Sequence, residues 1–168
     1  ACAPAGRLIE SPSRFLDAAD AHTCAIDERG ALHCWGSNDQ GEIVVPTSLT
    51  TVKHVTASSG AHTCAIDIEG TVQCWGDNEN GQTDVPESLT EALTVTAGSY
   101  HTCAVDGEGL VVCWGDDSWN QTDVPTGLGS ALALSAGSGH TCAIDASQTV
   151  HCWGDNDYGQ ASVPHTLG

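Results

Sequence analysis

Residues 60–86 read GAHTCAIDIEGTVQCWGDNENGQTDVP, and the same pattern occurs four times along the chain. The motif His-Thr-Cys-Ala begins at residues 22, 62, 101 and 140, and Cys-Trp-Gly begins ten residues after the cysteine of each copy. A Val-Pro pair follows, with its proline eleven residues after the tryptophan. The period is therefore 39 or 40 residues, a length typical of repeats that stack as β-propeller blades.

Each repeat is expected to contain several short strands. In the second copy, β-rich runs lie at 52–57, 62–67, 71–75 and 83–85, and Pro86 suits a strand end because it has no N–H for a sheet ladder. These runs predict an all-β, β-propeller-type repeat protein with four four-stranded blades of about 39 residues. The predicted divisions, together one domain, are a lead at 1–13 and repeats at 14–50, 51–89, 90–128 and 129–168.

The turn inside each repeat predicts a disulfide. Asp67 and Gly70 suit a three-residue hairpin loop whose last residue is left-handed, and this loop places Cys64 directly opposite Cys74. Directly opposed residues of a non-hydrogen-bonded pair are close enough for a disulfide. The competing role, cysteine and histidine as metal ligands, lacks the Cys-x2-Cys spacing. The predicted pairs are Cys24–Cys34, Cys64–Cys74, Cys103–Cys113 and Cys142–Cys152. Gln148 in place of glycine predicts a fourth turn that is either strained or different.

Strand alternation assigns two apolar faces to each sheet. In the second copy Cys64 and Ile66 share one face, whereas Ala65 and Trp75 share the other. A sheet that is apolar on both faces has to stack on neighbours, so the repeated tryptophans are predicted to lie in the blade core. Each histidine lies two residues before a cysteine, on the cystine face, and is predicted to make a structural hydrogen bond.

The repeated pattern resembles the regulator of chromosome condensation repeat family. The resemblance runs from about Phe15 to Pro164 and is greatest to secreted bacterial members, which include a β-lactamase inhibitor. It implies a propeller of four-stranded blades that binds proteins rather than catalysing reactions. The family usually closes its ring with more than the four repeats found here, and nucleotide-exchange activity is not carried over to any residue of this chain.

Charge limits the choice of partner. The 168 residues include 22 acidic and only 4 Lys and Arg side chains, a formal net charge of −18. Binding to phosphate backbones and to anionic membranes needs clustered basic residues, so neither a nucleic-acid partner nor membrane insertion is expected. Nine cysteines, eight of them in regularly spaced pairs, indicate an oxidising compartment, so the protein is expected to be secreted, extracellular or periplasmic.

Four repeats leave open how the ring is completed. An incomplete ring exposes a sheet face at each end, which is an association hazard. Three arrangements would cover these faces: the four blades close into a small ring of their own, two chains share an eight-bladed ring, or chains add head to tail. The unpaired Cys2 is a candidate for an intermolecular disulfide. We therefore expect a secreted, non-catalytic, self-assembling repeat protein that forms a ring or filament.

The loops after Cys-Trp-Gly, together with Tyr100 before the third His-Thr-Cys-Ala, carry the candidate binding residues of the alternative function. In this alternative the protein is a monomeric protein-binding module, such as an inhibitor of an extracellular enzyme, or a lectin-like binder. Exposed loop aromatics make good anchors, and carboxylates with amides are possible calcium ligands, although an Asx-type turn explains them more simply. The candidates are Tyr100, Trp119, Tyr158, Asp77, Glu79, Asp116, Asp117, Asp155 and Asp157, with calcium considered at Asp77, Asp116 and Asp155. No catalytic motif is present and no cofactor is expected.

Overall fold

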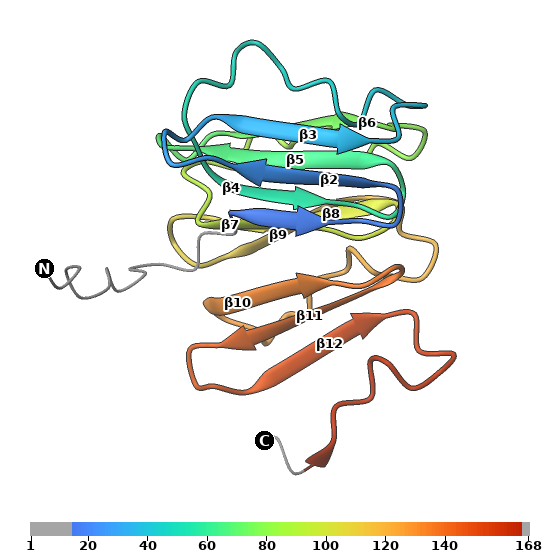
Figure 1. The fold of residues 1–168 in the computed structure, drawn as a ribbon. Helices are drawn as coiled ribbons and strands as arrows, with labels where there is room; N and C mark the ends of the chain where they lie inside the picture. The colour runs from blue at the N-terminus through green and yellow to red at the C-terminus, as the bar shows by residue number, and fades with distance from the viewer. Residues whose placement is uncertain (1–14, 166–168) are drawn as a thin grey trace, which may run out of the picture.

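The computed structural model describes residues 15–165, which form four antiparallel three-stranded sheets, one from each repeat (Figure 1). Strands pair in chain order within every sheet, and the sheets follow one another from the blue end to the red end of the chain. The strands are β1 Leu16–Ala18, β2 His22–Ile26, β3 Leu32–Gly36, β4 Val52–Ala57, β5 His62–Asp67, β6 Val72–Gly76, β7 Thr94–Ala97, β8 His101–Val105, β9 Val111–Gly115, β10 Ala131–Ala136, β11 His140–Asp145 and β12 Val150–Gly154.

The predicted hairpin register is confirmed. The N–H of Asp67 donates to the carbonyl of Thr71 across 3.1 Å, and Gly70 is left-handed with φ +90°. Cys64 then lies opposite Cys74, as expected. All four predicted disulfides form, each with its Cα atoms 4.1 Å apart.

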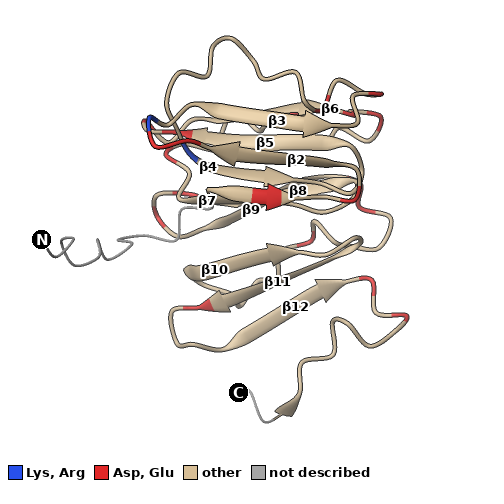
Figure 2. Cartoon of the chain, viewed as in Figure 1, with Lys and Arg blue, Asp and Glu red and all other residues tan. Residues whose placement is uncertain are grey.

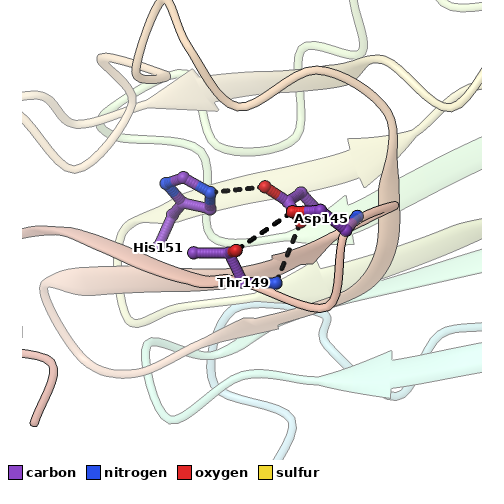
Figure 3. A network of polar contacts seen from close by, with 4 residues as sticks. Asp145, Thr149 and His151 are labelled. Carbon is purple, nitrogen blue, oxygen red and sulfur yellow. Dashed lines mark hydrogen bonds and ion pairs between the residues drawn. The ribbon is translucent and has the colours of Figure 1, made fainter. Parts of the chain in front are cut away.

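The fourth turn keeps the same shape without glycine. Gln148 adopts φ +67°, a conformation that side chains other than glycine disfavour. The Asp145 carboxylate holds the turn together: its Oδ1 accepts the N–H groups of Ser147 and Thr149, and its Oδ2 lies 2.8 Å from Nε2 of His151 (Figure 3). Hydrogen bonds from Ser147 and His151 keep the pKa of Asp145 well below its usual range. This anchored Asx turn tolerates Gln148.

The predicted fourth strand is wrong. Residues 83–85 form no sheet pair, because local turns use their N–H groups. The N–H of Asp84 donates to Gly81, and that of Val85 donates to Thr83 only two residues back. Pro86 then has no N–H at all. The same turns recur in the other repeats, so the blades are three-stranded with an ordered loop in place of the outermost strand.

The core lies between the sheets. We call the side of a blade that carries its cysteines the cystine face, the other side the tryptophan face, and the contact between neighbouring blades a joint. At the first joint Cys24 and Ile26 pack against Ala65 and Trp75, and at the second the cystine face of the next blade packs against Trp114. The predicted division into two apolar faces is therefore confirmed, and the repeats stack in one direction.

Candidate functional site: the open faces of the blade stack

Every joint contains the same polar contacts. At the second joint, the Oγ1 of Thr102 and the indole Nε1 of Trp114 both donate to the backbone carbonyl oxygen of Gln82, across 2.8 and 2.9 Å. Nε2 of His62 lies 3.0 Å from the same Thr102 hydroxyl. The corresponding residues of the first joint are Glu42, Thr63, Trp75 and His22, and those of the third are Gln121, Thr141, Trp153 and His101.

The hydrogen-bond pattern determines the protonation state of the histidines. The single hydroxyl proton of Thr102 is donated to Gln82, so Thr102 accepts from His62, whose Nε2 carries a proton. Nδ1 of His62 and of His101 is buried and has no hydrogen-bond partner within residues 15–165. Burial lowers the pKa of His62 to about 3 and that of His101 to about 4. The predicted structural hydrogen bond is confirmed for His22, His62 and His101, and at His62 and His101 it uses the neutral ring. For His140 the prediction is wrong, because no blade follows it within residues 15–165.

Glycine allows the blades to approach closely. Gly115, the last residue of β9, has φ +104°, and a Cβ on it would lie 2.6 Å from the carbonyl oxygen of Tyr100 and 3.2 Å from Cα of Gln82 in the preceding blade. Gly76 and Gly154 make equivalent approaches to residues 42 and 121. The glycine of Cys-Trp-Gly is therefore part of the joint as well as of the strand.

The inner strands continue the joints towards the axis of the stack. The Oδ2 of Asp17 accepts the N–H of Ala57, Oγ1 of Thr56 accepts that of Ala97, and Oγ1 of Thr96 accepts that of Ala136. These strand ends surround a cavity of about 500 Å³ that is lined mainly by small and hydroxyl side chains. Ser135 occupies the corresponding position in the last blade and is exposed.

The tryptophan face of the first blade, which we call the head face, is uncovered. Trp35 is 52% exposed, whereas Trp75 is 9% exposed and Trp114 and Trp153 are similarly buried. The predicted core position of Trp35 is therefore wrong, because no blade precedes the first one within residues 15–165. Leu16 lies beside Ala25 on the same face and is also exposed, although its counterparts Val55 and Val95 are buried.

The cystine face of the last blade, which we call the tail face, is uncovered as well. Ile144 is 38% exposed, whereas its counterpart Ile66 is fully buried. Cys142, Cys152 and Val150 on this face are half-buried, as is Gln160, whose counterparts Gln82 and Gln121 are buried. Within residues 15–165, His140 has no threonine across from it, whereas His101 has Thr141. The tail face therefore presents the surface that accepts a tryptophan face at the three internal joints.

The loop aromatics are exposed, as the alternative function requires. Trp119 and Tyr100 are about half exposed, and Tyr158 is 94% exposed. All three lie at the end of the blades where the middle strands begin, and Trp119 reaches the neighbouring blade near Gly139. No hydrogen bond or packing contact joins the three rings within the described range. The structure therefore places them on one edge of the stack, with Tyr100 and Trp119 on the third blade and Tyr158 on the fourth.

The loop carboxylates form Asx turns. Oδ1 of Asp77 accepts the N–H of Glu79 and its Oδ2 accepts the amide of Gln82. Asp116 makes the corresponding bonds to Ser118 and Gln121, and Asp155 accepts the N–H of Asp157. Asp117 caps its loop through the N–H of Thr122. Among the described residues, no three His, Cys, Asp or Glu side chains converge as metal ligands.

Charge is concentrated on the loops rather than on the sheets. The carboxylates gather at the two ends of the strands, and the strands themselves carry few (Figure 2). Arg29 and Lys53 are the basic side chains between residues 15 and 165. No helix in that range is long and apolar enough to cross a membrane. Cys2, the candidate for an intermolecular disulfide, lies outside the described residues.

Stacked antiparallel sheets joined face to face, with their first strands on the inner side, define a β-propeller-type blade repeat. The chain belongs to the regulator of chromosome condensation (RCC1) repeat family, whose repeat matches residues 18–42, 52–82, 93–121 and 132–160. No curated protein sequence matches the chain.

Solved structures share this fold. The CRINKLY ectodomain of the Arabidopsis thaliana receptor kinase ACR4 is 27% identical with a TM-score of 0.69, and the match covers 83% of this chain and 49% of that one. The ectodomain of the Physcomitrella patens receptor kinase CR4 is 30% identical with a TM-score of 0.70, over 89% and 42% of the two chains. Prp20p from Saccharomyces cerevisiae, at 22% identity and a TM-score of 0.74 over 89% and 46%, shows the fold alone.

The chain thus spans less than half the length of each of these proteins. Its four disulfides and its similarity to receptor ectodomains indicate an oxidising extracellular compartment. These comparisons give no support for the expected resemblance to secreted bacterial inhibitors.

Proposed function

We propose that this protein is a secreted, non-catalytic association module whose head face binds the tail face of a second copy. The new contact is a fourth joint of the same kind as the three inside the chain. Such a contact is heterologous, so it closes a ring if the rotation allows and otherwise extends a filament. Two copies in a closed ring have eight blades.

The observation that carries this proposal is the exposure of Trp35 compared with the burial of its three counterparts. The donors of the head face are the Trp35 indole and the Thr23 hydroxyl, and neither has an acceptor within residues 15–165. The tail face offers the carbonyl of Gln160 and the ring of His140 at the matching positions. Docking these faces would repeat a hydrogen-bond pattern that the chain already forms three times.

The two faces also match in apolar shape. At the internal joints Val55 and Val95 of the tryptophan faces are buried, and Leu16 presents the equivalent side chain on the head face. Ile144 presents the equivalent of Ile26 and Ile66 on the tail face. Because the carboxylates lie mainly on the loops, the net charge of −18 acts at the rim of the contact rather than within it. No nucleic acid or membrane partner is proposed, since basic side chains are scarce.

The test is the native mass of the chain by light scattering after size exclusion, over a range of concentrations. A species of at least twice the 17.3 kDa chain mass that dissociates on dilution is expected. The Ile68→Ser variant, which changes an exposed turn residue of the second blade away from both end faces, should keep this mass. A monomer at every concentration would refute self-association.

A second candidate function uses the loop edge instead. Tyr158 is almost fully exposed, and Trp119 and Tyr100 are half exposed beside the carboxylates of Asp116 and Asp155. Exposed aromatics next to acidic groups suit a monomeric binder of another extracellular protein, such as an enzyme that it inhibits, or of a sugar. This function predicts a monomer whose binding is lost in Trp119→Ser and Tyr158→Ser and kept in Trp35→Ser.

A further inference from the structure

The open joint differs from the internal joints in the state of one histidine. His22, His62 and His101 are buried under the next blade and hydrogen-bonded to its threonine. His140 is half-buried, because no blade follows it within residues 15–165. The His140 ring already packs on the backbone of Gly137, so closely that a Cβ on this glycine would lie 2.1 Å from Cε1 and 2.5 Å from Nδ1 of His140. Gly98 packs on His101 in the same way.

A closed joint accepts the neutral histidine and not the charged one. The hydroxyl of the threonine across the joint already donates its hydrogen bond to the backbone carbonyl of Gln or Glu. It can therefore only accept a hydrogen bond from the N–H at Nε2. A second proton on Nδ1 would face the glycine backbone, where His62 and His101 find no partner among the described residues. An imidazolium in that place loses its hydration without gaining a hydrogen bond.

We propose that protonation of His140 gates the head-to-tail joint: the joint closes while His140 is neutral and opens when it takes up a proton. This inference rests on the proposed self-association and names its regulation. In the closed joint Thr23 of the incoming copy would take the place that Thr141 occupies opposite His101. Protons therefore compete with the second copy for the tail face, and acidification disassembles the protein.

The charged groups around His140 do not reverse this effect. Asp155 lies at the position of Asp116 on its own blade. The first blade of an incoming copy would bring His33, paired with Asp27, on its head face, and Asp17 and His22 on its cystine face, with Asp20 in the turn between β1 and β2. At His101 the carboxylates of Asp116 and Asp117 favour the proton, yet burial prevails and lowers the pKa to about 4. At His62 the neighbouring histidines His101 and His22 lower the pKa further, as His22 of the incoming copy would at His140.

The gate acts without unfolding the blades. The pKa values of about 3 for His62 and about 4 for His101 keep these two internal joints neutral at pH 5. His140 in the open joint is only half-buried, so mild acid acts there and leaves the second and third internal joints closed.

The test is the dissociation constant of self-association from pH 8 to pH 5, measured by sedimentation or light scattering on dilution. Closing each joint requires His140 to release one proton. Lowering the pH in the acid range therefore weakens binding by up to about tenfold per pH unit. His140→Gln retains an amide donor without a titratable group, so its dissociation constant should stay level with pH. His151→Gln, on the other face of the same blade, should behave like the wild type.

The outcomes separate this gate from the function on which it rests. A monomer at pH 8 refutes self-association and the gate together. Self-association with the same affinity at pH 8 and pH 5, or an unchanged pH dependence in His140→Gln, overturns the gate alone. If His140→Gln does not associate, the NMR signal of the His140 ring in the wild type decides: it should titrate in dilute monomer and not in the assembled protein, and equal titration in both contradicts the gate.

Discussion

Replacing Trp35 with alanine should weaken self-association and leave the fold intact. Trp35 is 52% exposed and its counterpart Trp75 is 9% exposed, so closing the joint covers a little under half of this side chain. With roughly 250 Å² for a tryptophan side chain, about 100 Å² leaves water, which is worth about 2.5 kcal/mol at roughly 25 cal/mol per Å². This corresponds to roughly a 70-fold increase in the dissociation constant.

The assay compares the dissociation constant with the free energy of unfolding. For Trp35→Ala we expect the weaker association and a change in unfolding free energy of less than about 1 kcal/mol, measured by denaturant titration of the dilute monomer. The matched variant Trp114→Ala removes the same side chain from an internal joint, together with its bond to Gln82, and should cost about 3–5 kcal/mol of stability. Equal destabilisation by the two variants, or unchanged association in Trp35→Ala, would refute the distinction between open and closed joints.

Three further predictions concern the joints themselves. Under mild reductant, Cys142–Cys152 should be alkylated before the other pairs because it lies on the uncovered face, and self-association should protect it; mass spectrometry of the labelled cysteines checks both. Gly115→Ala should cost more than about 2 kcal/mol, whereas Gly41→Ala, with φ +85° and open space around its Cβ position, should cost about 1 kcal/mol in thermal or denaturant unfolding. Because burial lowers the pKa of His62 to about 3, the unfolded chain binds a proton that the folded chain refuses, so the urea midpoint should fall as the pH drops from about 6.5 towards 4, and less in His62→Gln.

Local chemistry made much of the fold predictable. Asp67 and Gly70 define a turn of known shape, and that turn alone places Cys64 opposite Cys74. The same argument applied to four copies gave all four disulfides correctly. The strand at 83–85 was predicted from its β-forming residues, but a sheet also needs a partner with free N–H groups, and local turns at Asp84 and Val85 use these groups instead.

The joints depend on contacts that lie about one repeat apart, so no local rule predicts them. The residues missed by sequence reasoning are the buried acceptors Glu42, Gln82 and Gln121, whose backbone carbonyls accept hydrogen bonds from the indole and the hydroxyl of the following repeat. Their recurrence beside the Asx turns was a usable signal. The exposure of Trp35 could not be predicted from the repeat alone. Trp35 lies in the same Cys-Trp-Gly motif as the three buried tryptophans, and only its place at the end of the stack differs.

The central claim is that head and tail faces of separate copies form a joint, and mixing two blocked variants tests it most directly. Trp35→Arg blocks the head face and Ile144→Arg blocks the tail face, so each variant alone should be a monomer of about 17.3 kDa by light scattering. An equimolar mixture has one intact head and one intact tail, and it should form a one-to-one dimer of twice that mass. A mixture that stays monomeric, or a single variant that still self-associates, would contradict the account.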